Sequence, residues 1–381
     1  MATKSSSGKK MTKAQKKKRK QKKIAILAVE AVVVVILIVA LYLVSKLDYI
    51  HKDEIDESEI VTNRNQEEDL LVSEGDIKFN DSLGGHMDGY RNIALFGVDA
   101  RNNNLGKGAR SDTIIIASIN EETKEIKLVS VYRDTYLNLG TDKYNKCNSA
   151  YAQGGPRQAI NMLNMNMDLN ITDYVTVGWA AVADTVDALG GIWIDVDEVE
   201  LGHLNNYQVE TSQSLGRDYT KLTQTGLVRL DGIQAVSYCR IRYTAGDDFK
   251  RAERQREVIQ AMAEEAKKAD PATLDKIANA VFPKTATSLK LSEILDLLKD
   301  IGSYEIVDES GFPFAEYRAT KTWSASIGDA VLPVDLETNV LELHKFLFGD
   351  VGDYTPSRAV QNYGAIISSD SGVYKQEGSG E

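Results

Sequence analysis

Four short segments of the chain bring arginine and aspartate close together in sequence. They are Asp99-Ala-Arg101, Arg110-Ser-Asp112-Thr113, Arg133-Asp134-Thr135, and a longer stretch containing Arg240, Arg242, Asp247, Asp248, Arg251, Arg254 and Gln255. Guanidinium groups bind phosphate oxygens in forked pairs, and carboxylates bind Mg²⁺ or accept a proton. The seven arginines and five aspartates therefore have the composition of a diphosphate site, provided that folding brings the segments together.

The helix expected to begin at Asp248 adds a second argument for an anion. Asp248 suits the N-cap, but Arg251 and Arg254 fall in the first two turns. There the positive end of the helix dipole repels cations by roughly 0.3–1 kcal/mol each, and a bound anion would reverse this penalty. The alternative is that these arginines merely pair with Asp247, Asp248 and Glu253, and spacing alone favours neither explanation.

The composition excludes several other kinds of site. Eleven Lys and Arg residues and no acid occupy positions 1–23, and without them 34 basic residues face 56 acidic ones, a net charge of about −22. That balance does not fit a nucleic-acid partner. The four histidines show no zinc-ligand spacing, and the two cysteines allow at most one disulfide.

The N-terminal region predicts one membrane span. The basic tail 1–23 is followed by an apolar run, Ile24 to Val44, interrupted by Glu30. Its length of roughly 32 Å matches a bilayer core, so we predict a transmembrane helix over 24–45. The positive-inside rule places the tail in the cytoplasm and the rest outside the cell. A cleaved signal peptide is the alternative, although no clear cleavage site follows the run.

Beyond the span, the positions of strands and helices predict an α/β domain. The acidic segment 46–88 is expected to be an extracellular stalk. The β-branched runs 92–98, 113–119 and 126–132 predict strands, and 192–196 predicts another. Helices are expected over 156–165, 179–189, 231–238, 248–268, 291–299 and 336–348. We therefore expect a single domain over 89–348 with a central mixed β-sheet flanked by helices, and a flexible C-terminal tail over 349–381.

The charged segments belong to a longer series of motifs that resembles the LytR-CpsA-Psr family. The motifs, in order, are Asn92-Ile-Ala-Leu-Phe-Gly-Val-Asp99-Ala-Arg101, Arg110-Ser-Asp-Thr113, Leu128-Val-Ser-Val-Tyr-Arg-Asp-Thr135, Lys146-Cys-Asn-Ser-Ala-Tyr-Ala-Gln-Gly-Gly155, Val186-Asp-Ala-Leu-Gly-Gly191, Leu230-Asp-Gly-Ile-Gln-Ala-Val-Ser-Tyr-Cys-Arg-Ile-Arg242 and Asp248-Phe-Lys-Arg-Ala-Glu-Arg-Gln255. Two positions depart from the family pattern, because Tyr132 replaces a common proline and Lys250 a common glycine. Cys147 and Cys239 stand where aliphatic residues are usual, which favours buried thiols.

The resemblance implies a phosphotransferase at the outer face of the cell membrane. Such proteins move a glycopolymer phosphate from an undecaprenyl diphosphate carrier onto peptidoglycan, usually onto the muramic acid 6-hydroxyl, with the lipid tail in an apolar tunnel. Asp99 and Asp112 match the ligands of Mg²⁺ (or Mn²⁺). Catalytic positions match Asp99, Arg133, Asp248 and Arg251. Substrate-binding positions match Arg101, Arg110, Arg133, Arg240, Arg242, Arg251, Arg254 and Gln255.

Two other functions fit the same residues. A non-catalytic regulatory module would bind the lipid-linked polymer without turnover. A polyprenyl pyrophosphatase would use water in place of the sugar hydroxyl. The sequence does not identify the polymer, which would be teichoic acid, capsule or another wall glycan.

Overall fold

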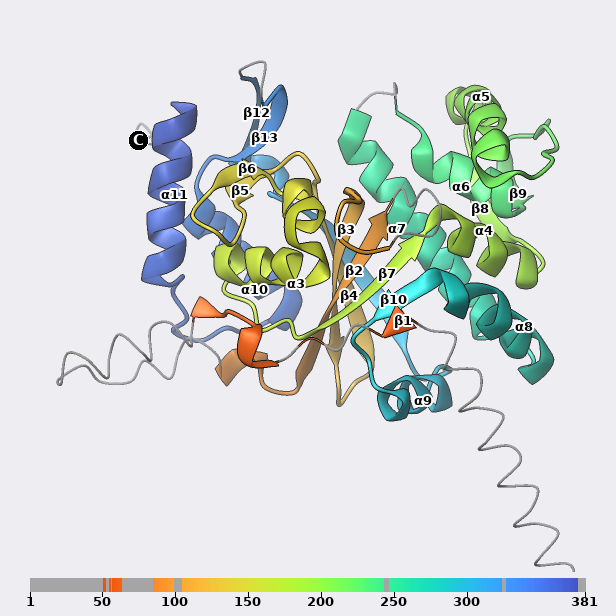
Figure 1. The fold of residues 1–381 in the computed structure, drawn as a ribbon, viewed down its shortest axis with the longest axis horizontal. Coiled ribbons are helices and arrows are strands. Elements are labelled where there is room, and N and C mark those ends of the chain that lie inside the picture. The colour runs from red at the N-terminus through yellow and green to blue at the C-terminus, as the bar shows by residue number, and fades with distance from the viewer. Residues whose placement is uncertain are drawn as a thin grey trace, which may run out of the picture. The chain divides into compact units, whose positions relative to one another are not determined.

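The described part of the chain is built on a seven-stranded mixed sheet with helices on both faces (Figure 1). The computed structural model describes residues 51–52, 55, 57–63, 85–98, 105–242, 247–323 and 327–375, all within the unit Ile50–Glu381. The strand order is β1-β10-β7-β2-β3-β4-β11. This arrangement confirms the predicted α/β class with a central mixed sheet.

The centre of the sheet consists of the three strands predicted first. They are β2 (Tyr90–Val98), β3 (Ser111–Asn120) and β4 (Glu125–Val131), paired antiparallel. β7 (Asp173–Gly178) runs parallel to β2, and β11 (Glu305–Phe312) runs parallel to β4. The sheet is completed by β10 (Thr285–Thr287) and β1 (His51–Lys52). Because β2 and β7 are parallel, their C-terminal ends lie side by side, and the first residue of β3 lies next to the end of β2.

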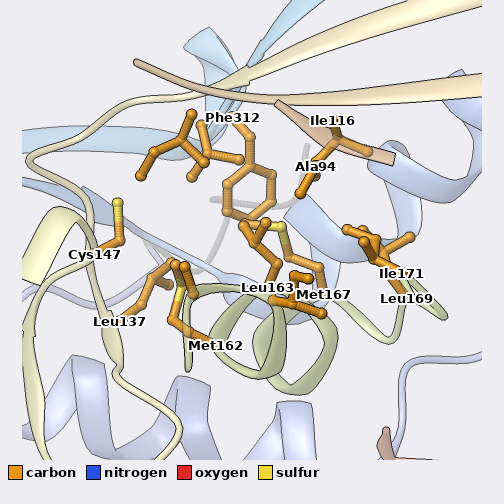
Figure 2. Packing of buried hydrophobic residues seen from close by; sticks show 14 of the residues in the cluster. Ala94, Ile116, Leu137, Cys147, Met162, Leu163, Met167, Leu169, Ile171 and Phe312 are labelled. Atoms are coloured by element: carbon orange, nitrogen blue, oxygen red, sulfur yellow. The ribbon is translucent and has the colours of Figure 1, made fainter. Parts of the chain in front are cut away.

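One face of the sheet is covered by α3 (Asn148–Met167) and α10 (Leu336–Phe348). A further helix, α11 (Arg358–Ser371), packs against these two helices. Figure 2 shows sheet residues Ala94, Ile116 and Phe312 packed against Leu163 and Met167. These side chains are almost fully buried, and burying each large one contributes roughly 1.5–3 kcal/mol. This face is the main core of the domain.

The opposite face is covered by α7 (Asp247–Ala266), which packs Ile259 against Ile115 of β3. A second core joins α7 to α4 (Trp179–Ala188), α5 (Glu198–Leu215) and α6 (Gly232–Arg240). It also includes the predicted strand β8 (Ile192–Val196), which pairs with β9 (Gly226–Leu230) in a separate ribbon. Asp231 caps α6, because its side chain accepts a hydrogen bond from the backbone N–H of Gln234.

The remaining elements are short connections and outer helices. They are β5 (Tyr136–Asn138), β6 (Tyr144–Lys146), α8 (Pro271–Val281), α9 (Leu291–Lys299), β12 (Arg318–Thr322), β13 (Asp329–Pro333), and the 3-10 turns η1 (Glu57–Glu59), η3 (Gly85–Met87), η5 (Phe282–Lys284) and η6 (Ala315–Tyr317).

Two predicted boundaries are wrong. The predicted C-terminal tail contains α11, which buries Val360 and Ile367 against the main core. The predicted stalk contributes β1 to the sheet, and Asn63 within it is buried, with its Nδ2 2.6 Å from Oδ1 of Asp168. In both places a few apolar or amide side chains within a polar segment pack against the domain or form hydrogen bonds with it. The domain therefore extends beyond 89–348.

The predicted basic tail 1–23 and transmembrane helix 24–45 lie outside the described residues. Among the residues that the structure does describe, no helix is long and apolar enough to cross a bilayer.

A buried histidine, His344 of α10, makes stability depend on pH. One ring nitrogen lies 2.7 Å from Nε2 of His86, and the other lies 2.8 Å from the carbonyl oxygen of Met167. Burial lowers the pKa of His344 to about 3, and His86 adds to the effect. The unfolded chain therefore takes up a proton near pH 6.5, whereas the folded chain does so only near pH 3.

We expect the contribution of His344 to be complete above about pH 6.5 and to fall by roughly 1.4 kcal/mol per pH unit below it. Thermal unfolding of the purified chain between pH 7 and 5 measures this loss, to which the carboxylates also contribute. The variant His344→Gln isolates the histidine, because it keeps a hydrogen-bonding amide and removes the titration. An identical pH slope in the variant would contradict the prediction.

Candidate functional site

Asp248, in the first turn of α7, is the point where three arginines meet. Its Oδ1 lies 3.0 Å from Nη1 of Arg251 and 3.6 Å from Nε of Arg242, and its Oδ2 lies 3.5 Å from Nη2 of Arg133. Arg251 belongs to α7, Arg242 follows α6, and Arg133 follows β4. Folding therefore gathers the three arginines that the sequence analysis expected to lie together.

Arg133 connects Asp248 to two further carboxylates. Its Nη1 lies 2.7 Å from Oδ1 of Asp112, and its Nε lies 3.4 Å from Oδ2 of Asp134. Asp134 also lies 3.0 Å from Nζ of Lys146 on β6. The result is a continuous array of alternating charges across the ends of β4 and β6 and the start of β3.

The backbone that presents Arg133 is fixed by the start of α3. The N–H of Asn148 donates to the carbonyl of Arg133 at 3.2 Å, and the N–H of Cys147 donates to the carbonyl of Thr135 at 2.8 Å. Cys147 and Cys239 are buried free thiols, as predicted, and burial raises the pKa of both. The loop after β4 is therefore held rigidly under the arginine.

The charges in this array shift the pKa values of its members. Burial lowers the pKa of Arg251 to about 10, and repulsion by Arg133 and Arg242 lowers it further. Attraction by Asp248 and Asp112 raises the pKa but does not offset this decrease. Burial alone would raise the pKa of Asp248, but Arg251, a hydrogen bond from Asp134, Arg133 and Arg242 together lower it. Burial and that hydrogen bond raise the pKa of Asp134. Asp248 is thus ionised at neutral pH, and the crowded arginines favour an additional anion.

A polar pocket and an apolar cavity adjoin at this array. The pocket, about 300 Å³, is lined by Asp112, Arg242 and Arg251 and by six further residues: Trp179, Tyr207, Glu210, Cys239, Arg240 and Gln255. The cavity, about 190 Å³, lies between α7, α4 and the sheet, and its lining includes Leu95, Ile115, Val177, Val258, Ile259 and Met262. Trp179, Cys239 and Gln255 line both spaces. A ligand with a charged head and an apolar tail would fit both.

Arg240 lies on the side of the pocket formed by α5. Its Nη2 is 3.0 Å from Oε1 of Glu210, its Nη1 donates to Oγ1 of Thr211 at 2.9 Å, and its guanidinium lies 5.8 Å from the centre of the Tyr207 ring. Arg240, a predicted binding residue, therefore lines the pocket. Its side chain contacts residues of α5 and not the Asp248 cluster.

The other predicted residues have different positions. Arg254 is 3% exposed and pairs with Glu200 at 2.8 Å, so it lies behind the pocket lining. Arg110 is exposed just before β3. Asp99 and Arg101 lie outside the described residues. The roles assigned to these four residues remain predictions.

Five residues at the site were not predicted as site residues: Lys146, Trp179, Tyr207, Glu210 and Cys239. Asp134 was counted among the five aspartates but was given no role of its own. Asp134 directly follows Arg133 and Lys146 is the first residue of the fourth motif, so their charge within the motifs was the available signal. Trp179 is the first residue of the helix predicted over 179–189, and that position gave no signal for a site. Tyr207 and Glu210 lie on α5, which the sequence analysis did not predict, so no signal pointed to them.

Residues 45–327 match the LytR_cpsA_psr family, and the chain belongs to this family. This confirms the resemblance carried by the seven motifs. One relative is the polyisoprenyl-teichoic acid–peptidoglycan teichoic acid transferase TagU of Enterococcus faecalis, 32% identical over 214 residues. The match covers 55% of this chain and 65% of that relative, which is less than two thirds of its length.

Solved structures show the same fold. The structure of TagT bound to LIIa-WTA is 23% identical, with a TM-score of 0.55, and the match covers 73% of this chain and 95% of that one. Protein gbs0355 from Streptococcus agalactiae is 22% identical, with a TM-score of 0.62, and the match covers 76% of this chain and 96% of that one.

Proposed function

We propose that this protein is a phosphotransferase that moves a glycopolymer phosphate from an undecaprenyl diphosphate carrier onto peptidoglycan, at the muramic acid 6-hydroxyl, and releases undecaprenyl phosphate. The observation that carries the proposal is the shared wall between an arginine-lined pocket and an apolar cavity. The arginines would bind the diphosphate and the cavity would take the start of the lipid tail. The TagU relative, named as a teichoic acid transferase, supports the same class of reaction.

The reaction needs positioning and charge neutralisation more than covalent chemistry. The acceptor hydroxyl oxygen forms a bond to the phosphorus that carries the glycopolymer, and the bond from that phosphorus to the bridging oxygen breaks. Arg133 and Arg251 would stabilise the negative charge on the departing undecaprenyl phosphate. Asp248, ionised at neutral pH, would accept the hydroxyl proton.

A divalent cation fits one side of the pocket. The Asp112 side chain is 27% exposed and lines the pocket, so its carboxylate can reach a cation there. Mg²⁺ in phosphoryl-transfer sites is held by one or two carboxylates together with phosphate oxygens and water. Asp112, with Asp99, would hold Mg²⁺ or Mn²⁺, and the ion would neutralise charge on the diphosphate when bound.

We expect Asp112→Asn to raise the Mg²⁺ concentration needed for half-maximal transfer by about tenfold or more, because it removes a charged oxygen ligand. Mg²⁺ titrations of the transfer rate at saturating donor measure this. An unchanged half-maximal concentration with a lower rate would show instead that Asp112 acts through Arg133, its partner at 2.7 Å.

The position of the domain forms part of the proposal. We propose that 24–45 anchors the chain in the cell membrane, with the N-terminus in the cytoplasm and the domain extracellular. The basic residues of 1–23 support this orientation. The carrier lipid and peptidoglycan would then both lie within reach of the site.

The decisive experiment uses the purified full chain in liposomes with Mg²⁺, a lipid diphosphate-linked glycan and peptidoglycan fragments. We expect glycan on the fragments and an equal amount of undecaprenyl phosphate. Binding without turnover would favour a regulatory module. Release of free glycan phosphate without fragments, at the same rate, would favour a pyrophosphatase.

A further inference from the structure

We propose that the α5 side of the pocket is a saccharide subsite, in which the Tyr207 ring and the Glu210 carboxylate bind the first sugar of the donor, the one joined to the diphosphate. The inference rests on the proposed function and adds the residues that would distinguish a sugar-bearing lipid from a bare lipid diphosphate. α5 lies in the chain between β8 and β9 and reaches the pocket through these two side chains.

The pocket has three chemically different sides. Asp112, Arg242 and Arg251 form the charged side. The side shared with the apolar cavity holds Trp179, Cys239 and Gln255. Tyr207, Glu210 and Arg240 form the third side, which belongs to neither. A glycosylated lipid diphosphate also has three parts, and the first two sides match its diphosphate and its tail. The third side is left for the sugar.

The third side is held in place by Arg240. Its guanidinium lies over the Tyr207 ring at 5.8 Å and pairs with Glu210 at 3.0 Å. Arg240 also donates a hydrogen bond to Oγ1 of Thr211 at 2.9 Å. Thr211 is 1% exposed, so this hydrogen bond restricts the movement of the arginine side chain. Arg240 is itself 22% exposed, whereas Glu210 is 68% exposed. The aromatic ring and the carboxylate are therefore pre-positioned, and the carboxylate remains accessible.

This pair of groups suits a pyranose. An aromatic ring offers an apolar face that packs against the C–H face of a sugar, and an ionised carboxylate accepts two hydroxyl hydrogen bonds at once. Such charge-assisted hydrogen bonds are stronger than those between neutral groups. The positive charge of Arg240 on this side is already paired with Glu210, so this side favours a neutral sugar over a second phosphate.

The test compares two probes, undecaprenyl diphosphate and undecaprenyl diphosphate-N-acetylglucosamine, on the purified full chain. We expect Tyr207→Ala and Glu210→Gln each to weaken binding of the sugar-bearing probe by about tenfold and to change binding of the bare probe by less than about twofold. Tyr207→Phe should bind both probes normally. Tyr219→Ala is the matched control, because Tyr219 is an exposed aromatic that follows α5 and does not line the pocket.

The outcomes separate this inference from the proposed function. Equal weakening of both probes, or of neither, would overturn the saccharide subsite. Unchanged binding of both probes with a raised KM for the peptidoglycan acceptor would also overturn it, by assigning this side to the acceptor. If the unmodified protein binds neither probe, the proposed function itself fails. Thermal unfolding of each variant verifies that α5 remains folded.

Discussion

Replacing Arg133 with alanine should reduce glycopolymer transfer by about 10²–10³-fold, the usual effect of removing one pre-positioned donor from a charge-stabilising site. Arg133 contacts Asp112, Asp134 and Asp248, so it lies between all the described carboxylates of the cluster. Its guanidinium would face the negative charge that develops on the leaving phosphate. Single-turnover transfer from a labelled lipid-linked donor measures the loss without interference from product release.

Two companion variants make this measurement specific. Arg133→Lys keeps the charge but loses the forked geometry, and we expect it to recover only part of the rate. Arg157→Ala is the matched control, because Arg157 is 47% exposed on α3 and pairs with Glu59. A rate for Arg133→Ala within threefold of the Arg157→Ala rate would show that Arg133 does not stabilise the transition state.

The variant Asp248→Asn should lose stability and regain it on binding an anion. The substitution removes the negative charge shared by Arg133, Arg242 and Arg251. Breaking a fully buried pair costs about 3–5 kcal/mol, and because Asp248 is 27% exposed we expect about 1–3 kcal/mol here. Thermal unfolding of the purified chain, with and without inorganic pyrophosphate, measures both effects.

Pyrophosphate should raise the melting temperature of Asp248→Asn more than that of the unmodified protein, because the variant has a larger uncompensated positive charge. Asp353→Asn serves as the control, since Asp353 is exposed and far along the chain from the cluster. If pyrophosphate raises the melting temperature of all three proteins equally, the three arginines do not act together as an anion site.

The central strands and the arginine cluster were predictable because their signals are local. β2, β3 and β4 are continuous β-branched and apolar runs, and such runs are typical of strands buried on both faces. The segments with Arg133, Arg242 and Arg251 each follow a predicted strand or helix or begin one. Side chains in such places tend to meet at one edge of an α/β sheet.

The parts that could not be predicted depend on distant partners. α5 and α11 have polar sequences, and their few buried residues gain stability only from the surfaces they contact. Arg251 and Arg254 are three residues apart on one helix, yet Arg251 reaches Asp248 and Arg254 reaches Glu200. Glu200 lies on α5, a helix that was not predicted, so the different partners of the two arginines could not be foreseen.

Trp179, Cys239 and Gln255 stand between the polar pocket and the apolar cavity. Under the proposed function, the product undecaprenyl phosphate has the same hydrocarbon chain as the lipid-linked donor. Product and donor therefore compete for the same apolar cavity next to these three side chains. Turnover would then be limited by lipid exchange with the bilayer, and accumulated undecaprenyl phosphate would act as a competitive product inhibitor.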